Sequence, residues 1–396
     1  MILRLGTRAV TELSPKILWK MVYLYMIKGF FAIQAYKSRR KKGELFPPFM
    51  FVALTNICNL RCKGCWVEKE GTAYHMEEQD LDYLIQSVKK AKSHYVTLLG
   101  GEPFMHKNIW TILEKYPECY FQVITNGMLF TESNVAKLKK LGNITPLISV
   151  DGWKENNDER RGEGVFNSLS EGIDRLQKAK IFYGIATTIS KYNLDEVLSD
   201  KYLETFISKG ALYIWYYVTR PVGEGDHSHY CLSEEELVEV RKRLLVLRRK
   251  HPIVIIDTYW TAEGEAFCPA AMGLGYHIGP RGSIEICPPL SFATDTLKDN
   301  GGDVQKTLAS SQFLGGFEKF VNDRTKGCVI LEHPQELVSY IKDHGALDYS
   351  GRDALAEIDS ITPRHSHHLP GKEIPEDYWV YKFIKKNVFF GMGAGG

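Results

Sequence analysis

The sequence has few cysteines, almost no net charge and no long uninterrupted apolar run. Its 396 residues include eight cysteines, which are too few for a secreted scaffold held by disulfides. The 50 Lys and Arg nearly balance the 48 Asp and Glu, so the chain as a whole is not expected to bind nucleic acid. With 44% hydrophobic and 25% charged residues, the composition is that of a folded globular protein, which excludes a disordered chain or a fibre.

The first 48 residues are aromatic and basic, and we treat them as a helical segment outside the main domain. Their start, MILRLGTRAVTELSPK, lacks the apolar core and cleavage site of a secretory signal. Residues 17–36 are apolar, but Lys20, Lys28 and Gly29 interrupt them, so no membrane-spanning helix is expected. The aromatic and basic side chains that stand out are Trp19, Tyr23, Tyr25, Phe30, Phe31, Lys37, Arg39, Arg40, Lys41 and Lys42. Two interpretations stay open: a helix lying in a membrane surface, and a helix packed on the domain with a solvated basic face.

The last part of the chain, residues 346–396, is interpreted as a tail that repeats this pattern on a smaller scale. Aromatic residues alternate with lysines before a Gly-rich end: Trp379, Tyr381, Lys382, Phe383, Lys385, Lys386, Phe389 and Phe390. We expect a cytoplasmic protein. Under the membrane-surface interpretation, its attachment is peripheral and on the inner face of the membrane.

Residues 49–223 alternate short β-rich runs with longer helical stretches. Strands are predicted at 50–55, 95–99, 120–125, 144–150, 182–189 and 212–218, and helices at 81–91, 108–116, 134–141, 167–179 and 194–208. Strands that alternate with helices need right-handed crossovers and form a parallel sheet. Periodicity alone leaves open whether this sheet is flat or curls into a partial barrel. In both cases ligands bind at the carboxyl ends of the strands.

Residues 224–345 are predicted to form a linker helix followed by a small extension. Ser233 and the glutamates after it begin a helix that runs to about Arg249. Short strands are predicted at 253–256, 276–278 and 283–287. The last two are joined by Gly-Pro-Arg-Gly, which is a hairpin turn signal. We find no internal repeat.

Three cysteines follow the first predicted strand directly. Cys58, Cys62 and Cys65 are spaced by four and three residues, so one tight loop can bring their thiolates to a single soft metal centre. Three thiolates that hold a four-iron cluster leave one iron open to a small molecule. The alternative is a zinc loop whose fourth ligand comes from a distant residue.

Polar motifs end the following strands in the same order as in the radical S-adenosylmethionine (SAM) superfamily. They are Gly100-Gly101-Glu102-Pro103, Thr125-Asn126-Gly127, Ser149-Val150-Asp151-Gly152, the segment 158–166 with Arg161, and Thr187, Thr188 and Asn193. Together with the CxxxCxxC loop, roughly residues 49–223 resemble this superfamily. The resemblance implies a partial (β/α)6 TIM-type barrel with a small C-terminal iron–sulfur extension. It also implies a [4Fe-4S] cluster on the three cysteines and SAM bound by Gly100, Gly101, Glu102, Pro103, Asn126, Ser149, Asp151, Arg161 and Thr188.

The residue types in these motifs suit SAM chemically. The amino-acid end of SAM carries an ammonium and a carboxylate, which Glu102 and Arg161 can pair with. Gly100 and Gly101 let backbone approach a ligand closely. The resemblance further implies a low-potential electron donor of the flavodoxin or ferredoxin type. Its electron cleaves SAM to a 5′-deoxyadenosyl radical that attacks an unactivated C–H or C=C bond. The sequence assigns no catalytic residue that acts on the substrate.

A second cluster is expected from three later cysteines. Cys268, Gly282 and Cys287 are spaced like the opening of the SPASM or twitch extension that follows many radical SAM domains, but the rest of that pattern is absent. We therefore expect at most one auxiliary cluster, on Cys268, Cys287 and Cys328. Its fourth ligand would be missing, a non-cysteine residue or the substrate. The alternative is three unrelated structural cysteines.

The remaining cysteines and histidines carry weaker signals. Cys119 opens a strand, where a buried apolar thiol is expected. Cys231 lies in a polar loop and is interpreted as incidental. The histidines His365, His367 and His368 are interpreted as a solvated or substrate-contacting loop rather than a metal site.

The substrate class divides the functional hypotheses. The first hypothesis is a radical SAM enzyme acting on a hydrophobic lipid, terpenoid or tetrapyrrole, favoured by the aromatic and basic ends of the chain. The second is a SPASM-type maturase that modifies a peptide or protein. The third is an iron–sulfur electron-transfer or sensor protein, which the Gly-Gly-Glu-Pro motif and Arg161 argue against because an electron carrier needs neither.

Overall fold

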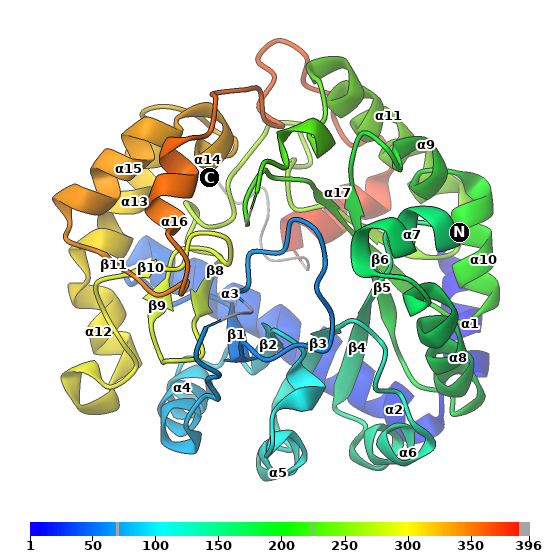
Figure 1. Cartoon of the computed structure of the whole chain (residues 1–396). Coiled ribbons are helices and arrows are strands. Elements are labelled where there is room, and N and C mark those ends of the chain that lie inside the picture. The colour runs from blue at the N-terminus through cyan, green and yellow to red at the C-terminus, as the bar shows by residue number, and fades with distance from the viewer. Residues whose placement is uncertain (69–70, 224, 388–396) are drawn as a thin grey trace.

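Nine strands form one sheet in the order β7-β6-β5-β4-β3-β2-β1-β8-β9 (Figure 1). The computed structural model describes residues 1–68, 71–223 and 225–387. The strands are β1 (Phe49–Thr55), β2 (Tyr95–Gly100), β3 (Tyr120–Thr125), β4 (Ile144–Ser149), β5 (Gly184–Ile189), β6 (Tyr213–Val218), β7 (Val254–Ile256), β8 (Gly275–Ile278) and β9 (Ile284–Glu285). Neighbouring strands from β7 to β8 pair in parallel, and β8–β9 is the antiparallel hairpin. The first six strands agree with the predicted ones.

The helices of residues 49–223 connect successive strands, as the parallel pairing requires. They are α4 (Glu78–Lys90), α5 (Ile109–Lys115), α6 (Glu132–Leu141), α7 (Lys154–Arg161), α8 (Val165–Lys178), α9 (Leu194–Val197) and α10 (Asp200–Ser208), with a short η2 (Pro103–Met105). The helix predicted at 194–208 is split into α9 and α10, because the Ser199 side chain accepts a hydrogen bond from Tyr202 N and begins a new helix there. Helix α7 was not predicted.

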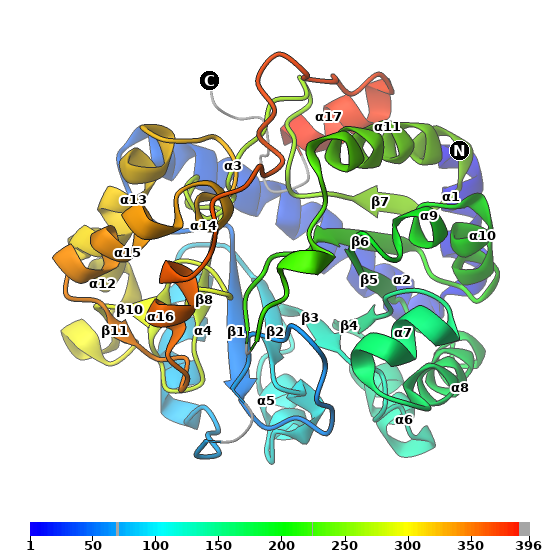
Figure 2. The same cartoon turned by 45° about the horizontal axis from the view of Figure 1, so that its top comes forward.

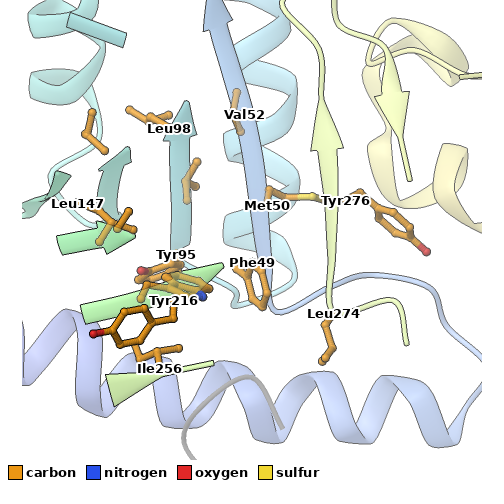
Figure 3. Close-up of a cluster of buried hydrophobic side chains, with 14 of the residues drawn as sticks. Phe49, Met50, Val52, Tyr95, Leu98, Leu147, Tyr216, Ile256, Leu274 and Tyr276 are labelled. Carbon is orange, nitrogen blue, oxygen red and sulfur yellow. The ribbon is translucent and has the colours of Figure 1, made fainter. Parts of the chain in front are cut away.

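Aromatic side chains fill the sheet near the amino-terminal ends of its strands. Tyr95 and Tyr120 stack with ring centroids 5.9 Å apart. Tyr213 lies over Gly184, where a Cβ atom would come within 2.4 Å of its ring, so a larger residue cannot replace this glycine without displacing the tyrosine. Figure 3 shows Tyr95 with Phe49 and Met50 in the same buried cluster.

The amino-terminal residues form helices that cover this end of the sheet (Figures 1 and 2). After α1 (Ile2–Glu12), the segments α2 (Pro15–Lys20), the π-helical η1 (Met21–Ile27) and α3 (Lys28–Lys41) continue one another as a single helix. The Tyr25 ring packs against Tyr95 and Tyr120, which begin β2 and β3, and against Phe182, which lies just before β5. The helix is therefore packed on the domain, which agrees with the second of the two interpretations given above. In the part of the chain that the structure describes, no helix has the length and apolar character needed to cross a bilayer.

The rest of the chain packs beside the sheet. Helix α11 (Glu234–Lys250) begins at Ser233 with a complete capping box, as predicted. The other elements are η3 (Ser228–Tyr230), β10 (Phe292–Ala293), η4 (Asp299–Gly302), α12 (Val304–Ser310), α13 (Gln312–Asn322), α14 (Val329–Glu332), α15 (Pro334–Asp343), β11 (Leu347–Asp348), α16 (Ala354–Asp359) and α17 (Trp379–Asn387).

Helix α17 is attached to the edge of the sheet by buried polar groups. The Tyr381 hydroxyl accepts a hydrogen bond of 2.8 Å from Ile255 N, and Lys385 Nζ lies 3.1 Å from an Asp257 carboxylate oxygen. Two side chains of the C-terminal aromatic and basic pattern are thus structural, whereas Trp379 and Phe383 are exposed. Phe389, Phe390 and the Gly-rich end lie outside the described residues.

Candidate functional site

The three-cysteine loop begins where β1 ends. The Thr55 hydroxyl donates to Tyr74 O at 2.6 Å and accepts from Ile57 N at 3.1 Å, which fixes the chain just before Cys58. Cys58 Sγ accepts a hydrogen bond of 3.4 Å from Leu60 N. Burial raises the pKa of the Cys58 thiol to about 11, with smaller contributions from Glu102, Cys62 and Cys65, so the structure brings all three cysteines together.

Three segments distant in sequence hold this loop in place. Lys63 N donates to Arg160 O at 2.9 Å, Arg352 bonds to Trp66 O, and Gly223 packs on the backbone of Cys65. Gly223 has φ +96° and a Cβ atom there would lie 2.5 Å from Cys65 O, so this position requires glycine. These contacts tie the cysteine loop to three distant parts of the chain.

Glu102 is a buried carboxylate at the end of β2. Its Oε1 accepts hydrogen bonds from Phe104 N at 3.1 Å and Thr125 Oγ1 at 2.8 Å, and its Oε2 accepts from Asn126 N at 2.8 Å. Burial raises its pKa to about 7 in spite of these bonds. Within the described residues, no Lys, Arg or His side chain forms an ion pair with it.

Asn126 connects Glu102 to the cysteine loop. Its side-chain Nδ2 donates to Asn59 Oδ1 at 2.8 Å and lies 3.9 Å from Cys58 Sγ. The ends of β2 and β3 and the cysteine loop thus form one network.

Gly100 and Gly101 lie close to the backbone at the start of the cysteine loop. Added Cβ atoms would lie 2.3 Å from Thr55 O and 2.1 Å from Ile57 O. Gly101 N and Glu102 N donate to these same two carbonyls, at 2.6 and 2.8 Å. The two glycines therefore allow close packing against the start of the cysteine loop. Their contact with SAM, and that of Pro103, which is buried in η2, stays a prediction.

Asp151 holds a pair of arginines at the end of β4. Its Oδ2 accepts hydrogen bonds from Arg161 Nε at 2.7 Å and from Arg160, and its Oδ1 accepts from Thr188 N at 2.8 Å. Burial alone would raise the pKa of Asp151, but the two arginines lower it to about 2. The Asp151 carboxylate is therefore ionised, and both of its oxygens accept hydrogen bonds from protein groups.

The contact with Asp151 orients the Arg161 side chain through its Nε and leaves its two terminal nitrogens available. Arg161 is buried, and its two terminal nitrogens make no hydrogen bond to a described residue. Ser149 lies half-buried at the last position of β4. Sequence reasoning missed Arg160, whose charge interacts with Cys62 and Cys65, although its position beside Arg161 was a usable signal.

The three later cysteines also come together. Burial raises the pKa of Cys268 to about 11 and that of Cys287 still higher, and the charges of these two thiols interact with each other and with Cys328. Arg220 Nε donates to Cys328 Sγ at 3.1 Å. Arg220 follows the last predicted strand of the core, where site residues are expected, but was not singled out. The charge of Arg220 also acts on Cys268 and Cys287. An auxiliary cluster on the three cysteines stays a prediction.

Cys231 lies beside this group of cysteines. It lines a small cavity together with Cys328 and Arg220, and its charge interacts with both. Cys119 is fully buried, as expected.

The histidine segment was expected to be a solvated or substrate-contacting loop, and His365 is exposed, whereas His367 is not solvated. His367 is buried, Trp260 Nε1 donates to its carbonyl at 3.2 Å, and burial lowers the pKa of its imidazole to about 3. This part of the segment is core because it packs against the residue before Cys268, Phe267, whose carbonyl lies 3.0 Å from His367 Nε2.

No group of three His, Cys, Asp or Glu side chains in residues 1–68, 71–223 and 225–387 is arranged to bind a single metal ion. The polar groups near Cys58 show whether this site could hold a [4Fe-4S] cluster together with SAM. Glu102 is buried without a cationic partner, and Arg161 has free donors. The ammonium of SAM could pair with Glu102, and its carboxylate could pair with Arg161. The residues present therefore fit a cluster with SAM bound to it.

Family comparison agrees with this site. Residues 52–200 match the model of the Radical SAM superfamily. They include the three-cysteine loop, Glu102 and Arg161, so this part of the chain is a radical SAM domain.

Two curated relatives illustrate the range of the similarity. The sporulation killing factor maturation protein SkfB of Bacillus subtilis (strain 168) is 31% identical over 231 residues, 56% of this chain and 55% of that protein. The AdoMet-dependent heme synthase of Methanosarcina barkeri (strain Fusaro / DSM 804) is 31% identical over 181 residues, 44% of this chain and 51% of that protein. The chain spans about half the length of these relatives.

Solved structures show the same fold at low identity. Streptococcus suis SuiB bound to its precursor peptide SuiA superposes with a TM-score of 0.60 at 17% identity, covering 75% of this chain and 72% of that one. The anSMEcpe structure with bound AdoMet has a TM-score of 0.55 at 17% identity, covering 69% and 80%. The predicted partial barrel is confirmed.

Proposed function

We propose that this chain is a radical SAM enzyme whose first cluster is held by Cys58, Cys62 and Cys65. The observation that carries this is the Glu102 carboxylate, which is buried without a cationic side chain in one network with Asn126 and Cys58. A buried carboxylate costs stability unless a positive group pairs with it. A SAM ammonium is such a group.

Each residue of this site has a task that its contacts support. Glu102 accepts the hydrogens of the ammonium, and Arg161, directed by Asp151, donates to the carboxylate. Asn126 fixes both Glu102 and the loop. When bound, the cluster and SAM supply one-electron chemistry on an unactivated C–H or C=C bond. The protein contributes binding, orientation and exclusion of water.

The auxiliary cluster is the second part of the proposal. Cys268, Cys287 and Cys328 would hold it beside Arg220. The candidates for its fourth ligand are Cys231, a non-cysteine group and the substrate. An arginine donating to a cluster sulfur stabilises the added electron and so raises the reduction potential.

For the substrate, we favour a peptide. SkfB is by its name a sporulation killing factor maturation protein, and the SuiB structure contains a precursor peptide. The hydrophobic substrate keeps support from the heme synthase relative, whose product is a tetrapyrrole. The aromatic and basic ends of the chain, which favoured a hydrophobic substrate, support it less in the structure. The aromatic helix lies at the amino-terminal ends of the strands, opposite the cysteine loop.

Anaerobic reconstitution followed by dithionite reduction tests the enzyme against the sensor alternative. Methionine and 5′-deoxyadenosine should accumulate from SAM and be lost in Cys62→Ala. Absence of both products with and without candidate substrates would instead favour the sensor. Mass spectrometry of small molecules and peptides that co-purify anaerobically would then distinguish the substrate classes.

A further inference from the structure

The long amino-terminal helix presents an apolar stripe to solvent. The stripe consists of Trp19, Tyr23, Met26, Ile27, Phe30 and Phe31. Its members recur every three or four residues and so lie on one side of the helix. Trp19 is 64% exposed and Phe31 is 62% exposed, which is unusual for such large side chains on a packed domain.

The opposite side of the same helix packs on the domain. Ile17, Leu24, Ile33 and Tyr36 are buried against the domain. On the outer side, the Trp19 and Tyr23 rings stack at 5.7 Å, and the Phe30 and Phe31 rings meet edge to face at 5.7 Å.

The stretch of chain that carries the stripe has charge of one sign, although Lys28 donates to the carbonyl of Glu118, whose carboxylate pairs with Lys89. Residues 13–43 contain eight Lys and Arg and no Asp or Glu. In the part of the chain that the structure describes, Arg40 is the one of these eight that forms an ion pair with a carboxylate, Glu318. The Lys28 ammonium lies 5.4 Å from the centre of the Tyr23 ring, and Lys41 and Lys42 are exposed at the end of the helix.

We propose that this face docks on an anionic lipid bilayer, with the stripe in the headgroup region and the lysines on the lipid phosphates. Trp and Tyr rings favour the membrane–water interface, and basic residues are attracted to anionic lipids. A second copy of the chain is a poorer occupant, because apposing two such faces would bring like charges together. Docking in this way would turn the cysteine loop, at the opposite end of the strands, toward the aqueous phase. This inference does not depend on SAM cleavage.

Vesicle flotation tests the proposal on the full chain. Vesicles of equal parts phosphatidylcholine and phosphatidylglycerol should bind the wild type, and added salt should weaken binding. The double variant Trp19→Ser/Phe31→Ser should lose about tenfold or more in partitioning. Val246→Ser/Leu347→Ser removes equally exposed apolar groups elsewhere and should bind like the wild type.

Other outcomes overturn the proposal. One is a wild type that stays unbound, and another is equal binding by both double variants. A third is a wild-type dimer in light scattering that the stripe variant makes monomeric, which would assign the stripe to a second copy. Far-UV circular dichroism and SAM cleavage should be unchanged in both variants, which separates a docking defect from misfolding or a wrong functional assignment.

Discussion

Replacing Glu102 by Gln tests the SAM site most informatively, because it keeps the shape of the side chain and removes its charge. The carboxylate is fully buried, so its contact with an ammonium is little screened by water. A charged hydrogen bond contributes about 1.5–3 kcal/mol. SAM affinity should therefore fall by about ten- to a hundredfold.

The matched variant Thr125→Val separates charge from positioning. It removes one of the three hydrogen bonds to Glu102 but leaves the carboxylate. Because Thr125 positions Glu102 but does not supply the charge, SAM affinity should fall by no more than about tenfold. Anaerobic equilibrium dialysis measures both variants, and their iron content should match the wild type.

The pH dependence of binding provides a second readout. Burial raises the pKa of Glu102 to about 7, and SAM pairs with the ionised form. From about pH 6 to 8, the ionised fraction rises roughly tenfold, so wild-type affinity should rise with it. Glu102→Gln should lack this rise. Equal SAM affinity of Glu102→Gln and wild type at about pH 8 would refute the assignment of Glu102.

Three further variants probe the rest of the site. Cys62→Ala should abolish the first cluster and SAM cleavage, as measured by iron content and product analysis. Cys287→Ala should lower iron by about one cluster while SAM cleavage without substrate persists, and an unchanged iron count would remove the auxiliary cluster. Asp151→Asn leaves two arginines without their counter-charge and should lower the free energy of unfolding by about 3 kcal/mol in urea titrations at neutral pH. Because its folded pKa is lowered to about 2, the Asp151 contribution is complete above its unfolded pKa and is lost as pH falls through about 2, so the variant should lack this acid-dependent loss.

The sequence predicts the six core strands closely, because each is a short apolar run that ends in Gly or a polar residue or is followed by one. Helix α7 could not be found in this way. Its sequence KENNDERR has no apolar face, and it is held instead by polar contacts such as Asp151 N to Asn157 Oδ1. Propensity and periodicity carry no signal for such a helix.

The other features that the sequence did not predict depend on contacts between residues that are distant in the chain. Arg352 bonds to Trp66 O across 286 positions, and Arg220 to Cys328 across 108. Strand β8 joins the core sheet beside β1, which the hairpin signal did not indicate. A single sequence contains no information on which distant surfaces pack. The structure was therefore needed to find these pairings and the position of Cys231 beside Cys328 and Arg220.

The central claim is that the cluster on Cys58, Cys62 and Cys65 keeps one iron open to SAM. Electron paramagnetic resonance of the reduced, oxygen-free Cys287→Ala protein tests it with the auxiliary cluster removed. The account predicts that SAM shifts the g-values and that nitrogen-15 in its amino group adds a measurable coupling. A spectrum that SAM leaves unchanged, with the cluster intact, would contradict it.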